Sequence, residues 1–445
     1  MAAREKFPLI PGSILNKFSI SAHAIFARPV TSKRFHPYTA LILLTALNLL
    51  NYVDRSVLFA VQPLVQSEFA LSNTQVGYLT SAFLLFYMVA APFVGPLADR
   101  YSRKIIIVTG AIFWSGLTLL TAVTHTYTEL LIRHTLVGIG EATFVTIAPT
   151  FVADMFPENK RGRILGIFYL AIPVGTASGY LLGGHLGAHY GWRSPFYVAA
   201  VPGFLLALSV LFLREPPRGQ FDSLRETPQR GTLRGLAHNP SFWTATLGMA
   251  AMTFALGGIQ VWMPTFLSQT RGYSLESANF TFGVIIVIDG ILASLAGGWL
   301  GDYLLPRMKS TYYFVSAVSM ALGVPVMIVA LFVKGRAMIP AIALAAFLLL
   351  FNTAPLNAAV INSVNATIRV TALAVNIFII HLLGDVPSPT MMGYMADRHS
   401  LQAAFVLPVI AMIISSAILF YGMRFAPPVQ FASASAAGHT GTGKT

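Results

Sequence analysis

One acidic residue, Glu141, lies in the middle of a mostly apolar stretch that runs from Arg133 to Phe156. The stretch is long enough to cross a bilayer, and a carboxylate at that depth costs about 2.5–3.5 kcal/mol on insertion scales. Gly138 and Gly140 precede it, and small residues let membrane helices approach one another closely. An acid placed at such a cost predicts a functional polar cavity between helices.

A histidine shares the helical face of this acid. His134 lies seven residues before Glu141, which is almost two complete turns, whereas Arg133 lies about 80° from that face. A carboxylate and an imidazole on one stripe could exchange or relay protons, and we assign both to proton coupling. The alternative for His134 is a polar residue close to the lipid head groups. Arg133 is predicted to face a substrate head group.

A second polar cluster is the segment Asn51–Arg55, NYVDR, in another apolar stretch. Asp54 and Arg55 point about 100° apart on a helix, and Asn51 shares their side. We expect Asp54 to couple to protons and Asn51 and Arg55 to bind substrate. A structural ion pair with another helix is the alternative.

The third cluster is His381 and Asp385, which are four residues apart and therefore lie on one helical face. They could form a proton site or a latch, or simply a mutual hydrogen bond within the helix. Pro387 and Pro389 follow and are expected to kink that helix. Asp289 is isolated in an apolar run and is either a cavity residue or paired elsewhere.

Further polar residues are assigned to the substrate site with less chemistry to support them. Tyr169, Asn352 and Asn357 could contact a substrate, although packing hydrogen bonds would also explain the two asparagines. Gly175, Gly179 and Gly183 recur every four residues, a stripe that is typical of close helix packing rather than of ligand binding.

The composition identifies the class of protein that must position these residues. The 445-residue chain is 55% hydrophobic and only 10% charged, and its mean hydropathy is +0.68. Soluble globular proteins carry about 25% charged residues, so we predict an all-α, polytopic membrane protein. The chain has no cysteine, which excludes disulfides and thiolate metal sites. We predict no metal ligands, no nucleophile constellation and no cofactor.

Twelve apolar spans follow a basic leader, residues 1–37, that is predicted to be a cytosolic tail; an interfacial segment, a mis-assigned start or a transit peptide are alternatives. A 27-residue loop, 214–240, divides the spans into two six-helix bundles, 38–213 and 241–424, and residues 425–445 form a tail. The predicted spans are 38–65, 73–98, 105–123, 128–155, 164–187, 194–213, 241–267, 276–300, 311–333, 337–363, 371–396 and 401–424.

The basic residues predict an orientation. With the N-terminus in the cytosol, cytosolic segments hold 22 of the 29 Lys and Arg residues and the outer loops hold five. This positive-inside pattern predicts that both termini are cytoplasmic. It also explains the net charge of +13 through topology and contact with anionic lipid head groups, without nucleic acid.

A short motif occurs once in each predicted half. Gly95–Asp99 and Gly298–Asp302 both read G-x-L-x-D, and the first continues with Arg100, Arg103 and Lys104. Repeated halves with a site at their interface are typical of secondary transporters. We predict that these residues form an inner gate, while a topology-setting turn is the simpler alternative.

One sequence motif is interpreted as a chance match. Residues 438–445, GHTGTGKT, match the pattern of a phosphate-binding loop, but such a loop needs a strand before it and a helix after it. No ATP binding is expected.

The spans and the motif GPLADRYSRK resemble the major facilitator superfamily over residues 38–424. More narrowly, five segments in order resemble the spinster branch: NYVDR (51–55), GEATFVTIAPTFVADMF (140–156), FYLAIPVGTASGYLLGG (168–184), REPPRG (214–219) and HLLGDVPSP (381–389). This resemblance implies transport of lysophospholipids or sphingoid phosphates, often proton-linked.

The resemblance carries Asp54, Arg55, Glu141, His381 and Asp385 over as functional residues. One position departs from it, because the family usually has arginine seven residues before the glutamate and this chain has His134. Asp289 is also not expected from the family.

These observations together predict a proton-coupled secondary transporter, a monomer in a cell or inner membrane, that moves an amphiphile by alternating access. Its partners would be a lipid-like substrate, protons and membrane lipids. A general drug or organic-anion efflux carrier is the closest alternative. A membrane sensor without flux is disfavoured, since the central loop leaves no room for an effector domain.

Overall fold

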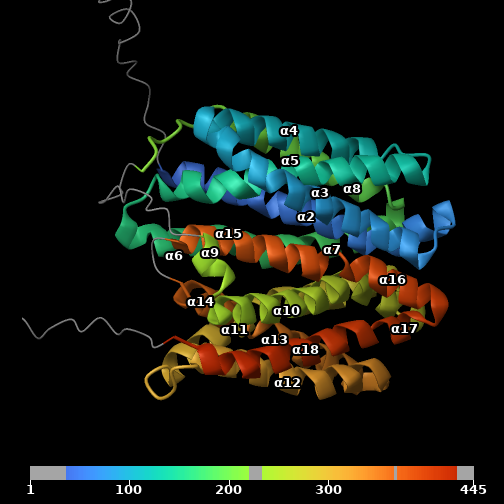
Figure 1. Ribbon diagram of the computed structural model, residues 1–445. Helices are drawn as coiled ribbons and strands as arrows, with labels where there is room; N and C mark the ends of the chain where they lie inside the picture. Colours follow the sequence, from blue (N-terminus) through green and yellow to red (C-terminus); the bar gives the residue numbers. More distant parts are fainter. Residues whose placement is uncertain (1–36, 220–232, 365–367, 428–445) are drawn as a thin grey trace, which may run out of the picture. The chain divides into compact units, whose positions relative to one another are not determined.

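The computed structural model describes residues 37–219, 233–364 and 368–427 (Figure 1). Residues 1–36 of the basic leader, residues 220–232 of the central loop and the GHTGTGKT motif lie outside the described residues. The described residues from Pro37 onward form one compact unit and are entirely helical or irregular.

The described residues 37–219 form seven helices. Their caps fit the sequence: Ser72 and Gln75 form a reciprocal capping box at the start of α3, and Thr126 caps α5. The helices are α2 (Pro37–Phe69), α3 (Asn73–Arg100), α4 (Arg103–Thr121), α5 (Tyr127–Ala153), α6 (Glu158–Tyr169), α7 (Ala171–Tyr190) and α8 (Ser194–Val210).

The described residues from 233 onward form the remaining elements, which include two π-helical turns. These elements are α9 (Leu233–Ala237), α10 (Pro240–Thr265), η1 (Phe266–Thr270), α11 (Leu275–Leu304), α12 (Thr311–Phe332), η2 (Gly335–Ala337), α13 (Met338–Leu350), α14 (Thr353–Asn362), α15 (Arg369–Ile380), η4 (His381–Asp385), α16 (Ser388–Arg398), α17 (Leu401–Ala404), α18 (Val406–Gly422) and η5 (Met423–Phe425).

Eleven helical segments of the described residues are long and apolar enough to cross a membrane. The sixth predicted span, 194–213, corresponds to α8, an apolar helix of 17 residues that is shorter than the others. The tenth predicted span is divided between α13 and α14, and the eleventh is interrupted by the π turn η4, directly before Pro387. The protein is therefore a multi-pass integral membrane protein.

The helices define two ends. We call the end where α2 begins and α18 finishes the terminal end, and the opposite end, where α2 finishes and α18 begins, the far end; they lie at the left and right of Figure 1. Helix α3 starts at the far end and finishes at the terminal end.

The glycine stripe of α7 packs on the backbone of α2. A Cβ at Gly175 would lie 2.5 Å from the carbonyl oxygen of Leu49, and one at Gly179 would lie 2.6 Å from that of Val53. Only a residue without a side chain permits this approach, which places α2 firmly against α7. This agrees with the packing role predicted for the stripe.

The apolar core is distributed unequally between the two ends. One cluster, which includes Leu44, Ile107, Trp114 and Phe151, is built only from residues between 40 and 213. The other joins far-end residues of α2, such as Val57, to residues of α10–α18. The segments before and after the central loop thus share apolar core at the far end.

Candidate functional site

The centre of the site is a buried ion pair. Arg55 of α2 donates from Nε to Oε2 of Glu141 of α5 over 2.6 Å, and the side chain of Glu141 is 0% exposed. Two of its polar atoms, Nη2 of Arg55 and Oε1 of Glu141, are buried without a hydrogen-bond partner. Buried polar atoms are normally satisfied, so these two mark a site that can accept a further polar group.

Aromatic rings surround the guanidinium of Arg55. Its Cζ lies 5.1 Å from the ring centroid of Tyr52, 5.2 Å from that of Phe83 and 4.6 Å from that of Tyr87. Cations within about 6 Å of an aromatic face are attracted to it. The rings hold the positive charge in place without neutralising it.

Asp54 faces a different neighbour from Arg55. It is 5% exposed, and the Thr118 hydroxyl of α4 donates to its Oδ2 over 3.4 Å. Its Oδ1 is buried without a partner. Asp54 is thus a second buried acid next to the ion pair along α2, with no ion-pair partner among the described residues.

The adjacent residues Arg133 and His134 of α5 lie in different environments. His134 is 4% exposed and stacks on Phe83, with ring centroids 5.1 Å apart. Arg133 instead donates to the carbonyl oxygen of Leu120 over 2.6 Å and pairs with Glu129 at 3.6 Å. Arg55, rather than Arg133, is the arginine that contacts Glu141.

His381 brings the segment after the central loop to this cluster. Its Nδ1 lies 2.9 Å from Oδ1 of Asp385, so the predicted pair forms within the π turn η4. Its ring meets Tyr87 edge-on, with centroids 6.0 Å apart. A continuous chain of contacts therefore runs from Asp385 through His381 and Tyr87 to Arg55.

Among the other predicted substrate residues, the two asparagines after the central loop bond within their own segment, whereas Asn51 lies beside Glu141. Asn352 and Asn357 donate to carbonyl oxygens of Leu349 and Thr353, three and four residues earlier in the chain. Tyr169 is exposed at the end of α6. Asp289 is 7% exposed, with its Oδ2 buried and unpartnered, and Asn51 is fully buried one turn before Arg55.

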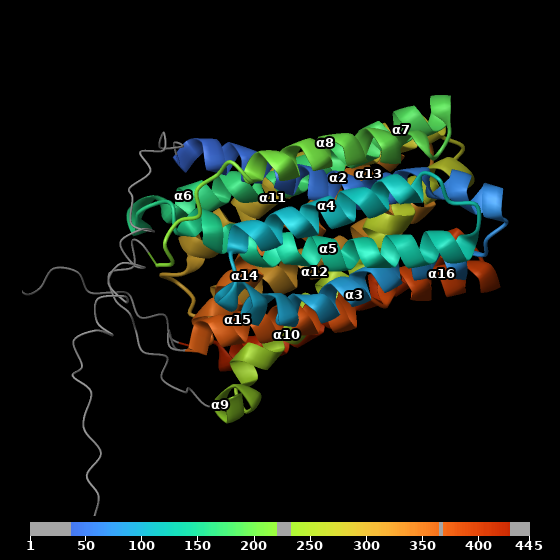
Figure 2. The same ribbon diagram turned by 90° about the horizontal axis from the view of Figure 1, so that it is seen from above.

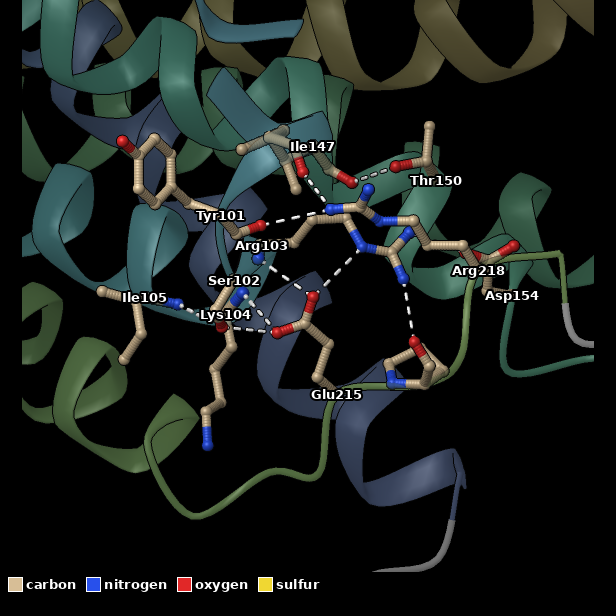
Figure 3. A network of polar contacts seen from close by, with 12 residues as sticks. Tyr101, Ser102, Arg103, Lys104, Ile105, Ile147, Thr150, Asp154, Glu215 and Arg218 are labelled. Carbon is tan, nitrogen blue, oxygen red and sulfur yellow. Dashed lines mark hydrogen bonds and ion pairs between the residues drawn. The ribbon is translucent and has the colours of Figure 1, made fainter. Parts of the chain in front are cut away.

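The first gate motif forms a polar network at the terminal end (Figure 3). Arg103 pairs with Asp154 at 2.6 Å and with Glu215 at 3.4 Å, and it also donates to the carbonyl oxygen of Pro216. Arg218 donates to the main-chain oxygens of Ala98, Asp99 and Tyr101. The network joins α3, α4 and α5 to the segment after α8.

Glu215 is held in this network as a carboxylate. Partial burial raises its pKa, but hydrogen bonds from the Ser102 hydroxyl and from the backbone amides of Arg103 and Lys104 outweigh burial, and the pKa lies below its usual range. Lys104 also donates from Nζ to the carbonyl oxygens of Leu211 and Leu213.

The remaining gate residues make fewer contacts. Asp302 of the second copy accepts a hydrogen bond from the Tyr312 hydroxyl over 2.8 Å. A Cβ at Gly95 would meet no atom within 4 Å, and one at Gly298 would be 3.4 Å from Ala354. Arg100 is exposed at the last position of α3.

Sequence reasoning missed the partners that complete these sites. Asp154 and Glu215 are 61 residues apart, and only folding brings both to Arg103. Phe83 and Tyr87 lie on an apolar face of α3 that resembles any other lipid-facing or core face. Their four-residue spacing on one helix was the only signal.

A pocket is present away from the buried ion pair. It has a volume of about 590 Å³ and lies at the far end, where Arg271, Lys334 and Arg336 line it together with Thr270, Tyr273, Gly335, Met338 and Ile339. The buried ion pair and this open basic pocket are therefore separate sites.

The helices and their buried charges define a transporter of the major facilitator superfamily. The family model described as Major Facilitator Superfamily matches residues 44–384, and the chain belongs to this family. Within it, the chain is of the spinster type. Protein spinster homolog 1 of Xenopus laevis is 34% identical over 380 residues, which are 80% of this chain and 72% of that protein.

A second relative carries a substrate in its name. A sphingosine-1-phosphate transporter of Danio rerio is 34% identical over 417 residues, which are 88% of this chain and 81% of that protein. Among solved structures, a bacterial homologue of the human lysosomal transporter spinster, in an inward-facing and unoccupied conformation, superposes with a TM-score of 0.81 at 24% identity, covering 89% of this chain and 98% of that one.

Proposed function

We propose that the protein is a proton-coupled secondary transporter of lysophospholipids or related anionic and zwitterionic amphiphiles, and that it works by alternating access. One observation carries the proposal: the buried pair of Arg55 and Glu141, with an unpartnered nitrogen on one side and an unpartnered oxygen on the other. The related sphingosine-1-phosphate transporter supports a lipid-like substrate with a phosphate.

Competition for Arg55 couples protons to substrate. While Glu141 is ionised, its carboxylate occupies Nε of the guanidinium. When Glu141 takes up a proton, its attraction for the guanidinium falls, and Arg55 becomes free to bind a phosphate through a charge-assisted, bidentate pair. Substrate release reverses the exchange, and Glu141 returns its proton.

The surrounding residues suit the two parts of an amphiphile. The rings of Tyr52, Phe83 and Tyr87 around Arg55 would accept a quaternary ammonium as well as apolar chain atoms. Asp54, His134 and the His381–Asp385 pair would take part in proton movement, and Asp289 would be a further acid for a cationic head group. The protein would act as a monomer with both termini in the cytoplasm.

The first test is Glu141→Gln in proteoliposomes. The amide cannot be ionised, so we expect lipid transport driven by a pH gradient to fall at least tenfold, while exchange of lipid without a gradient persists. Glu129→Gln is the matched control, because Glu129 pairs with Arg133 at the far end. Undiminished gradient-driven uptake by Glu141→Gln would contradict the proton role.

The second test separates substrates. Lysophosphatidylcholine, sphingosine phosphate and a soluble organic anion are compared as competitors for binding to the purified protein. We expect only the amphiphiles to compete, and Arg55→Lys to weaken them, because an ammonium cannot reproduce the two-pronged contact. Preference for the soluble anion would favour a general organic-anion carrier.

A further inference from the structure

We propose that His185, His189 and Glu276 form a binding site for a divalent transition metal such as Zn²⁺, and that the bound ion ties α7 to α11 at the far end. The three side chains come from helices on either side of the central loop. Neither the transport site nor the gate motif uses them.

The donor atoms already converge. Nδ1 of His185 lies 2.7 Å from Oε1 of Glu276, and Nε2 of His189 lies 4.0 Å from Oε2 of the same carboxylate. One ligand atom from each residue lies within 4.8 Å of the others. Zinc bonds of about 2.0–2.2 Å place neighbouring ligand atoms roughly 3.3 Å apart in a tetrahedron, so small side-chain rotations suffice.

The orientation of His189 favours a ligand rather than a simple surface histidine. Its Nδ1 lies 2.9 Å from the carbonyl oxygen of His185. A carbonyl only accepts, so Nδ1 carries a hydrogen, and in the neutral ring Nε2 presents its lone pair toward the carboxylate. Metal-binding histidines are held in this way by a hydrogen bond from their other ring nitrogen.

A hydrogen bond between His185 and Glu276 explains only two of the three residues. It leaves the ring of His189, which is tilted by 38° with its centroid 4.6 Å from that of His185, without a hydrogen bond to the carboxylate. When a metal binds Nδ1 of His185, the neutral ring carries its one hydrogen on Nε2 instead, so the ring stays neutral and no net proton is released. The three side chains are 57%, 51% and 45% exposed, so water can complete the coordination.

The site lies where α7 and α11 pack closely. A Cβ at Gly184 would lie 2.6 Å from Cβ of Asn279, and Asn279 donates to the carbonyl oxygen of Ala60 over 3.0 Å. A metal held by both helices adds a bond across this contact. If the proposed alternating access requires the far ends to separate, the ion slows transport by stabilising the closed far end.

Binding is tested first, without transport. The purified protein, prepared with a tag that contains no histidine, is titrated with Zn²⁺ by calorimetry. We expect one equivalent to bind at micromolar concentration, and His189→Ala and Glu276→Gln each to weaken it at least tenfold. His125→Ala, which removes another exposed histidine at the same end, should bind like the wild type. Equal binding by all variants, or none by the wild type, overturns the site.

The effect of the bound ion on the conformation is tested by distance measurements between two spin labels. The chain has no cysteine, so spin labels at Asn159→Cys and Tyr303→Cys, two exposed terminal-end positions, report on that end alone. We expect Zn²⁺ to narrow the distribution of distances between the two labels around the value of the conformation in which the terminal end is open. The variant His189→Ala should not show this effect.

If Zn²⁺ binds at the site but leaves the distances between the labels unchanged, the proposed effect of the ion on the far end is wrong. This part rests on the proposed function, and the two are separable. Loss of Zn²⁺ binding alone contradicts the site, whereas metal-free lipid transport that fails contradicts the function.

Discussion

The two ends of the molecule are held together in different ways. At the far end, polar bonds join the segments on either side of the central loop: Asp397 at the end of α16 accepts four hydrogen bonds from Asn73 and Thr74 at the start of α3, at 2.6–2.8 Å. At the terminal end, the Arg103 network joins only residues before 220. Figure 2 shows α3 running beside α16 toward the far end.

Two further hydrogen bonds join the segments before and after the central loop, and they lie in the half of the helices that is nearer the far end. Thr390 donates to Ser81 over 2.7 Å, and the Tyr180 hydroxyl donates to the carbonyl oxygen of Gln260 over 2.7 Å. Among the described residues, these hydrogen bonds tie the two segments together in the far half of the helices, whereas the Arg103 network lies within the first segment.

The largest effect is expected for Arg103→Ala. The guanidinium is buried between Asp154 and Glu215, and removing one partner of a buried pair costs about 3–5 kcal/mol. The melting temperature in detergent should fall strongly, and Arg100→Ala, at an exposed neighbouring position, should change it little. Equal losses in both variants would show that the network is not a structural tie.

Two glycines of α3 test the ends against each other. A Cβ at Gly77 would lie 2.5 Å from the carbonyl oxygen of Pro389 in α16, whereas one at Gly95 would meet nothing within 4 Å. Gly77→Ala should cost about 1–3 kcal/mol by overpacking, and Gly95→Ala should be neutral. Thermal unfolding of the two variants is the measurement, and similar melting temperatures would remove the asymmetry.

Asp397→Ala should moderately weaken the contact between α3 and α16 and make the far end more accessible to water. It removes four hydrogen bonds and an acid at the start of α3, where such groups stabilise a helix by about 1 kcal/mol. A cysteine at Ser81, which is half-buried against Thr390, should then react several-fold faster with a water-soluble thiol reagent. Asp302→Ala, at the terminal end, should leave that rate unchanged.

The smallest effect is expected from pH at Glu215. Its pKa in the folded protein lies below the ordinary value of 4.5, so its contribution to stability is complete above that value and disappears as pH falls through the folded pKa. Wild type should therefore be more stable than Glu215→Gln at pH 6, and the difference in stability should disappear as pH falls through the lowered pKa of Glu215. A constant difference across this range would contradict a charge-dependent tie.

Much of this arrangement was predictable from the sequence, and the limit is physical. Hydropathy located the helices because each must satisfy its backbone within itself in lipid. The burial of Asp54, Glu141 and Asp289 followed from their depth. Their partners could not be predicted, since pairing depends on the rotation of each helix against its neighbours, as the different environments of Arg133 and His134 show.

The gate repeat shows the same limit. The two G-x-L-x-D copies read alike, yet the first leads into buried Arg103 and its acids, while the second accepts a hydrogen bond from Tyr312 through Asp302. Spacing predicted equivalent turns, and the chain that follows each copy determines what the turn contacts.

The π turn at His381–Asp385 fixes a rotational phase. A π turn accommodates one residue more than an α-helix and rotates everything after it by about 100°. The helix that carries it therefore has two separately aimed faces, one with His381 against Tyr87 and one with Asp397 against Asn73. Deleting a single residue such as Leu382 would bring the two faces into ordinary α-helical register, and only one of them could then meet its partner.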